Sequence, residues 1–162
     1  MKCKDVEIKI DRINFLFTYF EGHEFDGDEQ LKSHIAKYLT VLISGMYEDM
    51  IKKIINQLIF NEMFLETTPK FFKNFVSDKV DRSFRNPDQG NTKGFLNSFN
   101  KEWTKTLNQI IDSECWDALD SIVRQKNLIA HGNDSTITFD DIKKYYGNSI
   151  GIIKELDRLI LE

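Results

Sequence analysis

The strongest constraint on the fold is a long apolar stripe in a part of the chain that contains no proline. Leucine, isoleucine and methionine recur at steps of three and four residues from Leu39 to Leu58, and the first of only two prolines is Pro69. This period matches one face of an α-helix, and proline would have broken such a helix. The sequence therefore predicts a long helix from about residue 29 through Leu58, which would form the spine of the domain.

Stripes with the same period predict further helices on both sides of this spine. The predicted helices cover about residues 5–20, 69–86, 95–110, 113–131 and 142–160, with polar connections at 21–28 and 88–94. No alternation typical of β-strands, internal repeat or low-complexity segment competes with this interpretation. We expect an all-α bundle of about five or six helices that forms a single domain over residues 1–162.

Residues with known capping preferences mark several predicted helix ends. A threonine pair precedes Pro69, which places a cap donor before a proline at the first helical position. Gly132 suits the left-handed conformation that ends many helices, and Thr138 precedes Asp141 by three residues, as in a capping box.

Composition narrows the class of protein. The balance of 41% hydrophobic and 30% charged residues over 162 residues is typical of a soluble globular domain. The only cysteines, Cys3 and Cys115, lack the nearby cysteine or histidine of a zinc site, so both are expected to be reduced thiols. No secretion signal or stretch of about 20 apolar residues is present. We expect a cytoplasmic protein that does not bind membranes and needs no metal or other cofactor.

Charge is distributed unevenly along the chain. The net charge is −4, which argues against a protein that coats nucleic acid, yet residues 70–105 hold eight basic and four acidic residues, a net of +4. This segment is either a place where a phosphate backbone rests or simply a solvated helix face. Its aromatic residues could stack on unpaired bases, but their helical spacing favours core packing: Phe71, Phe72, Phe75, Phe84, Phe95, Phe99 and Trp103.

Arg124 and His131 form the most informative pair of polar residues. Positions seven apart in a helix differ by about 20° around the axis and about 10 Å along it, so both side chains lie on one face with Asn127. A histidine can exchange protons near neutral pH, and an arginine matches the charge and shape of a phosphate. These groups fit RNA cleavage without a metal, although spacing alone favours the simpler explanation of a surface arginine and a capping histidine at a helix end.

The run Arg-x-x-Asn-x-Ile-Ala-His-Gly over residues 124–132 resembles the signature of the HEPN (higher eukaryotes and prokaryotes nucleotide-binding) superfamily. That signature is an arginine, four to six residues, then a histidine near the end of a helix in a bundle of four or five helices. The resemblance is strongest over residues 114–162, extends loosely to residues 44–48, and is closest to the prokaryotic RiboL-PSP branch associated with defence and toxin operons.

This resemblance implies a homodimer whose two motif helices face each other across a ribonuclease cleft. Arg124 and His131 are then the catalytic residues, with Asn127 in support, although the polar residue often follows the arginine directly, where this chain has Gln125. Lys126, beside the cleft, is a candidate RNA contact.

Glu48 is a further candidate because it lies among apolar residues of the predicted spine. It could orient Arg124 across the bundle, or it could pair with Lys52 one turn later.

Two functions from different classes remain open. The first is a metal-independent endoribonuclease, a toxin or phage-defence effector that is restrained by an antitoxin or operon partner. The alternative is a non-catalytic HEPN module that binds RNA, a nucleotide or a protein, and a small helical interaction protein with a coincidental motif is a third. No Gly-rich phosphate loop, His-Glu-x-x-His motif or nucleophile elbow points to another class of enzyme.

Overall fold

The computed structural model describes residues 1–22, 28–62 and 64–162. These residues form seven helices, α1 (Lys4–Glu21), α2 (Glu29–Glu62), α3 (Lys70–Ser83), α4 (Gln89–Asn97), α5 (Lys101–Ile110), α6 (Ser113–Ala130) and α7 (Phe139–Leu161), and no strand. The predicted all-α fold is confirmed, and the predicted count of five or six helices is corrected to seven for this part of the chain. Most of the predicted 21–28 connection lies outside the described residues.

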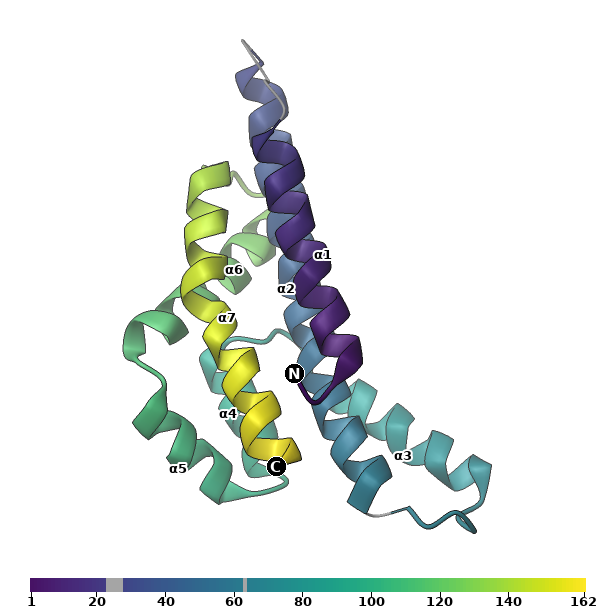
Figure 1. The fold of residues 1–162 in the computed structure, drawn as a ribbon. Coiled ribbons are helices and arrows are strands. Elements are labelled where there is room, and N and C mark those ends of the chain that lie inside the picture. Colours follow the sequence, from purple (N-terminus) through teal and green to yellow (C-terminus); the bar gives the residue numbers. More distant parts are fainter. Residues whose placement is uncertain (23–27, 63) are drawn as a thin grey trace.

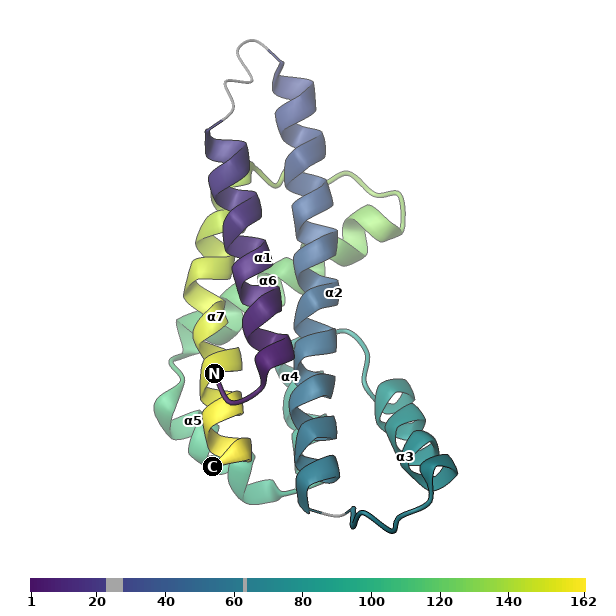
Figure 2. The ribbon, with the colours of Figure 1, turned by 45° about the vertical axis from the view of Figure 1, so that its right-hand side comes forward.

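The predicted spine is α2. Its 34 residues extend about 51 Å, and it packs against α1, α3, α6 and α7. Figure 1 shows α1 and α2 as a long antiparallel pair with α7 beside them, and Figure 2 shows α6 crossing these helices. The buried side of α2 is broad, and it includes the fully buried Leu39, Tyr47 and Ile55, which are spread over about 160° around the helix axis. In the described residues, no helix combines the length and apolar composition needed to cross a lipid bilayer.

The third helix projects from the bundle beside the C-terminal half of α2 (Figures 1 and 2). Pro69 is its N-cap rather than its first residue, and no side chain caps this end. The helix ends at Ser83, three residues earlier than predicted, because Phe84 adopts an extended conformation and is buried.

Two capping side chains divide the predicted 95–110 helix and lengthen it toward the N-terminus. Asp88 accepts a hydrogen bond from the backbone N–H of Asn91 at 2.8 Å, so α4 begins inside the predicted 88–94 loop. Asn100 accepts one from the backbone N–H of Glu102 at 2.9 Å and starts α5 as a separate helix. The apolar period alone predicts one continuous helix across this region, but the cap at Asn100 starts a second helix within it.

The connection between α6 and α7 forms as predicted. Gly132 has a φ of +71°, and the N–H of Asn133 donates to the carbonyl of Leu128 at 2.9 Å, which closes the end of α6. Thr138 and Asp141 form the expected capping box at the start of α7. These caps fix where the motif helix stops and where the last helix begins.

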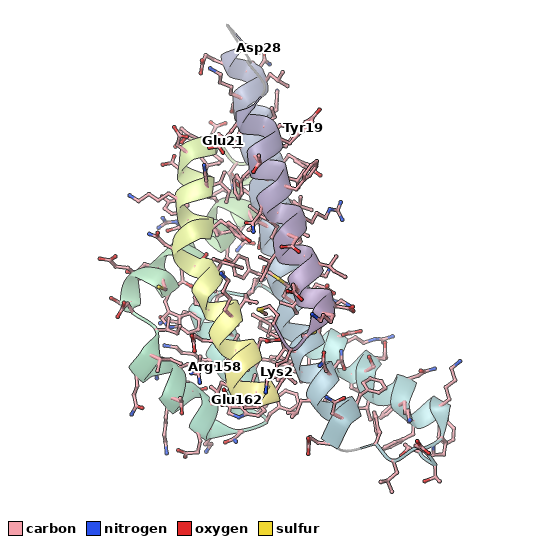
Figure 3. The ribbon with its side chains drawn as sticks, in the orientation of Figure 1. Lys2, Tyr19, Glu21, Asp28, Arg158 and Glu162 are labelled. Atoms are coloured by element: carbon pink, nitrogen blue, oxygen red, sulfur yellow. The ribbon has the colours of Figure 1, made fainter. Side chains whose placement is uncertain are left out.

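A buried carboxylate joins the two ends of the described fold. Asp157 on α7 is 3% exposed and accepts hydrogen bonds from the backbone N–H groups of Lys2 at 2.7 Å and Cys3 at 2.8 Å. Figure 3 shows Lys2 close to Arg158 and Glu162 at the end of α7. Because Cys3 is the N-cap of α1, this contact docks the first helix onto the last.

Replacing Asp157 tests this docking contact. Asp157→Ala leaves two backbone donors without their charged acceptor and is expected to lower the free energy of unfolding by about 2–4 kcal/mol, with Asp157→Asn between that and wild type. Urea unfolding followed by circular dichroism measures the change. Glu155→Ala, which removes only a surface ion pair on the same helix, is the control, and equal effects of the two alanine variants would contradict the assignment.

The capping box predicts a pH dependence. Hydrogen bonds from the Thr138 side chain and backbone N–H lower the pKa of Asp141 below its ordinary value of 3.8. Its contribution to stability is therefore present above that value and is lost as the pH falls through the lowered folded-state pKa. Asp141→Ala should cost about 1 kcal/mol near pH ~7 and clearly less near pH ~2 in urea titrations. A cost that does not change with pH would show that the charge of Asp141 is not involved.

Candidate functional site

The motif helix α6 is amphipathic, and its buried face fixes the direction of its polar face. Trp116, Leu119 and Ile122 are buried in the core, where α6 packs against α2 and α7. Because one turn takes about 3.6 residues, the side of α6 opposite to these residues points away from the core. Arg124 and His131 are exposed on that polar side.

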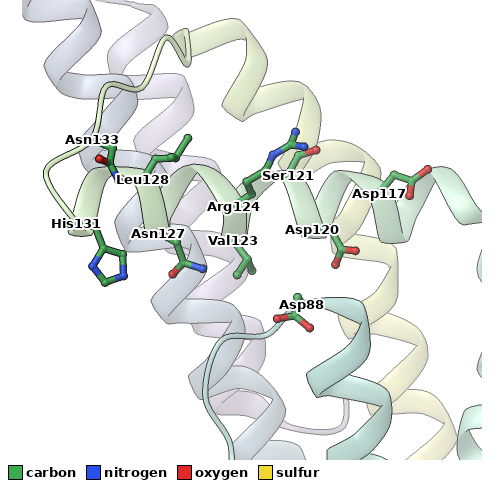
Figure 4. A pocket seen from close by; sticks show the side chains of 10 residues that line it. All are labelled: Asp88, Asp117, Asp120, Ser121, Val123, Arg124, Asn127, Leu128, His131 and Asn133. Carbon is green, nitrogen blue, oxygen red and sulfur yellow. The ribbon is translucent and has the colours of Figure 1, made fainter.

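An open groove of about 720 Å³ runs along the polar face of α6. Arg124, Asn127 and His131 all line it, so the structure brings the three predicted motif residues to one surface. Figure 4 shows them along α6, with Asp88 contributed by the start of α4 below. The groove is therefore a candidate site for a ligand that spans several side chains.

The two predicted catalytic side chains share the groove but do not meet. In Figure 4 the guanidinium of Arg124 extends toward Ser121, away from the imidazole of His131. Within the described part of the chain, neither head group has a hydrogen bond or ion pair. Both are thus available to a ligand, and a single chain does not hold them in contact with each other.

The amide of Asn127 is oriented by its neighbour. Lys126 donates through Nζ to Oδ1 of Asn127 at 2.9 Å and to Oδ1 of Asn86 at 2.5 Å. An ammonium group can only donate, so the amide atom that faces it must be the oxygen. The Nδ2 group of Asn127 therefore remains available to donate a hydrogen bond. The ammonium group of Lys126 is positioned beside the groove by its hydrogen bonds to two uncharged amides.

Asn86 connects the motif helix to the spine, and sequence reasoning assigned it no role beyond a helix stop. It has a φ of +50°, a left-handed conformation that asparagine tolerates better than most residues. Its N–H donates to Oε2 of Glu48 at 3.1 Å, and its side chain accepts from Lys126. The signal in the sequence was the Asn86–Pro87 pair, which marks a turn but does not reveal what the turn contacts.

Glu48 forms the pair with Lys52 that was one of its two predicted arrangements. Oε1 of Glu48 accepts from Nζ of Lys52 at 2.6 Å, and Arg85 lies 3.7 Å from the same oxygen. Arg124 has no ion pair among the described residues, so Glu48 reaches α6 through Asn86 and Lys126 rather than by direct contact with Arg124.

Acidic residues line the other end of the groove, and the sequence interpretation missed them. They are Asp88, Asp117 and Asp120. Oδ1 of Asp120 accepts from the N–H of Gln89 at 2.7 Å, and Lys93 lies 4.8 Å over the ring of Trp116 nearby. Desolvation lowers the pKa of Lys93, and the charge of Asp120 opposes this shift. Asp120 lies one turn before Arg124, a spacing that could have indicated its place on the same face.

The groove combines the guanidinium of Arg124, which is permanently charged, the imidazole of His131 and the amide N–H donors of Asn127. This set can hold a phosphate and exchange a proton with it or with a neighbouring hydroxyl. Among the described residues, no three His, Cys, Asp or Glu side chains are grouped in a way that could hold a metal ion. Gln125, next to Arg124, bonds instead to Ser135 at 2.9 Å, which leaves Asn127 as the amide that lines the groove.

Comparison with known proteins agrees with the motif. The family model described as RiboL-PSP-HEPN matches residues 4–162, which includes all seven helices. No curated protein and no solved structure shows a significant match. The match confirms the HEPN resemblance carried by residues 124–132 and extends it to nearly the full sequence. The chain therefore belongs to the RiboL-PSP-HEPN family.

Proposed function

We propose that this protein is a metal-independent endoribonuclease with Arg124 and His131 as its catalytic residues. In this proposal residues 1–162 form one HEPN domain that acts as a cytoplasmic homodimer. The observation that carries the proposal is the groove along α6, where Arg124, Asn127 and His131 line one surface and the first and last have no partner among the described residues.

The proposed reaction is attack of a ribose 2′-hydroxyl on the adjacent phosphorus. The bond from O2′ to phosphorus forms, the bond to O5′ breaks, and the products are a 2′,3′-cyclic phosphate and a 5′-hydroxyl. A base takes the proton of the 2′-hydroxyl, and an acid gives one to the leaving O5′. Arg124 and the Nδ2 group of Asn127 stabilise the negative charge that develops on the phosphoryl oxygens.

A second copy of the chain is part of this proposal. The attacking and leaving oxygens lie on opposite sides of the phosphorus, so one imidazole cannot reach both protons at once. His131 is the one histidine among the residues that line the groove. A dimer in which two motif helices face each other would supply two imidazoles and two guanidinium groups to a single cleft.

The remaining predicted residues support this site in different ways. Lys126 orients Asn127 and places a positive charge beside the groove, where it also attracts the RNA backbone. Glu48 holds the loop before α4 by accepting a hydrogen bond from the backbone N–H of Asn86. The side-chain oxygen of Asn86 in turn accepts a hydrogen bond from Lys126. We propose both as supporting residues that do not take part in proton transfer.

The biological role we propose is that of a toxin or phage-defence effector. The groove is open, and neither Arg124 nor His131 has a partner among the described residues, so none of these residues blocks the two groups. A ribonuclease of this kind needs an external restraint, which we assign to an antitoxin or another partner from the same operon.

Cleavage in the presence of EDTA tests the proposal. Wild-type protein should cut total RNA with all divalent ions chelated, His131→Ala should lower the rate about 10²–10⁴-fold, and Arg124→Ala about 10²–10³-fold. His34→Ala and Arg12→Ala are matched controls, because both side chains are exposed and neither lines the groove. Helicity and dimer mass are checked for every variant.

Other outcomes separate this function from its alternative. RNA binding by wild type and His131→Ala without cleavage by either would reject the ribonuclease and favour a non-catalytic HEPN binding module. Cleavage that survives both groove substitutions would show that the catalytic residues lie elsewhere.

A further inference from the structure

The outer face of α3 carries exposed aromatic rings. The spacing of the phenylalanines in this segment favoured core packing, and Phe84 and Phe95 are indeed buried, but Phe71 is 75% exposed and Phe75 is 55% exposed. Phe72 is also exposed. The prediction is therefore wrong for these three rings, because Val76 and Val80 occupy the side of α3 that faces the bundle. It is also wrong for Phe99, which is 40% exposed.

Basic side chains lie among these rings. Nζ of Lys79 is 5.3 Å from the ring centre of Phe75, and Nζ of Lys73 is 5.8 Å from that of Phe64. Neither ammonium forms an ion pair with a described residue. Residues 70–85 hold five basic and two acidic residues, a net of +3 in a chain whose net charge is −4. This segment is thus a positive, aromatic part of an acidic protein.

The C-terminal end of α3 leads directly to the groove of α6. Arg85 follows the helix with a side chain that is 70% exposed. The next residue, Asn86, bonds to Lys126 of the motif helix, and Asp88 lines the groove itself. The segment that follows α3 therefore runs directly from this helix to the groove.

We propose that the outer face of α3 binds single-stranded RNA. We call this face the α3 surface and define it by Phe71, Phe72, Phe75, Lys79 and Arg82. Unpaired bases stack on the exposed rings, and the phosphates between them lie against the ammonium and guanidinium groups. This inference deepens the proposed ribonuclease function, on which it rests for the identity of the nucleic acid.

The positive charge of this segment favours RNA over a protein partner, because residues 70–85 carry a net charge of +3. Lysine is depleted at the centre of protein interfaces, whereas Lys79 lies directly over one of the exposed rings. Single-stranded RNA is favoured over a duplex, because bases inside a helix are already stacked and cannot reach the rings.

Binding of a 2′-O-methyl oligouridylate of about 12 nucleotides tests the α3 surface. This probe lacks the hydroxyl that attacks in the proposed cleavage, so the wild-type protein can be used without cutting it. Fluorescence anisotropy in EDTA should show that Phe71→Ala/Phe75→Ala lowers the affinity at least about tenfold. Lys79→Ala should make the salt dependence shallower, by about 0.7 in the slope of log K against log salt. Phe15→Ala removes an equally exposed ring from α1 and should bind as wild type.

Each other result has a definite meaning. Equal affinity of the double variant and wild type, or no binding by wild type, overturns the α3 surface as an RNA site. A double variant that changes the oligomeric mass but not the RNA affinity shows that this face is a protein interface instead. If wild type fails to cleave natural RNA yet binds the probe through these rings, the ribonuclease proposal fails and the α3 surface stands.

Discussion

Burial of one face of α6 against α2 and α7 determines where the motif residues of the groove lie. Trp116, Leu119 and Ile122 have almost no exposed surface, so α6 cannot rotate about its axis without bringing polar side chains into the core. This constraint holds Arg124 and His131 toward solvent, two turns apart on one helix. The spine α2 is the other half of the constraint, because its buried side chains, including Tyr47 and Ile54, form much of the surface on which α6 and α7 rest.

Polar contacts refine what this packing begins. The left-handed Asn86 stands between the spine and the motif helix, since its N–H is held by Glu48 and its side chain accepts from Lys126. Lys126 in turn determines which atom of Asn127 faces the groove. The site thus consists of two exposed, unpaired groups at its ends and an oriented amide between them. Such an arrangement leaves the outer groups free to adjust to a ligand or to a second copy of the chain, while the amide is already in place.

Much of this could be predicted from the sequence, for reasons that differ between elements. The apolar period gave α1, α2, α6 and α7, because long amphipathic helices carry a strong signal, and the caps at Gly132 and Thr138 are local. The division of residues 89–110 into α4 and α5 was missed, because the side chains of Asp88 and Asn100 outweighed the apolar period. The exposed Phe71 and Phe75 were missed because periodicity shows which residues share a face but not whether another element covers it. Asn86 was missed because its role depends on contacts with residues 38 and 40 positions away.

The chemical groups at the product ends show whether the groove of α6 cleaves RNA by internal attack without a metal, as we propose. Mass spectrometry of the fragments released from a defined oligoribonucleotide in EDTA should show 2′,3′-cyclic phosphates paired with 5′-hydroxyls. Attack by the neighbouring 2′-hydroxyl produces these ends, whereas attack by water on the phosphorus does not. Fragments with 3′-hydroxyls and 5′-phosphates, or cleavage that appears only when a divalent ion is restored, would contradict the account.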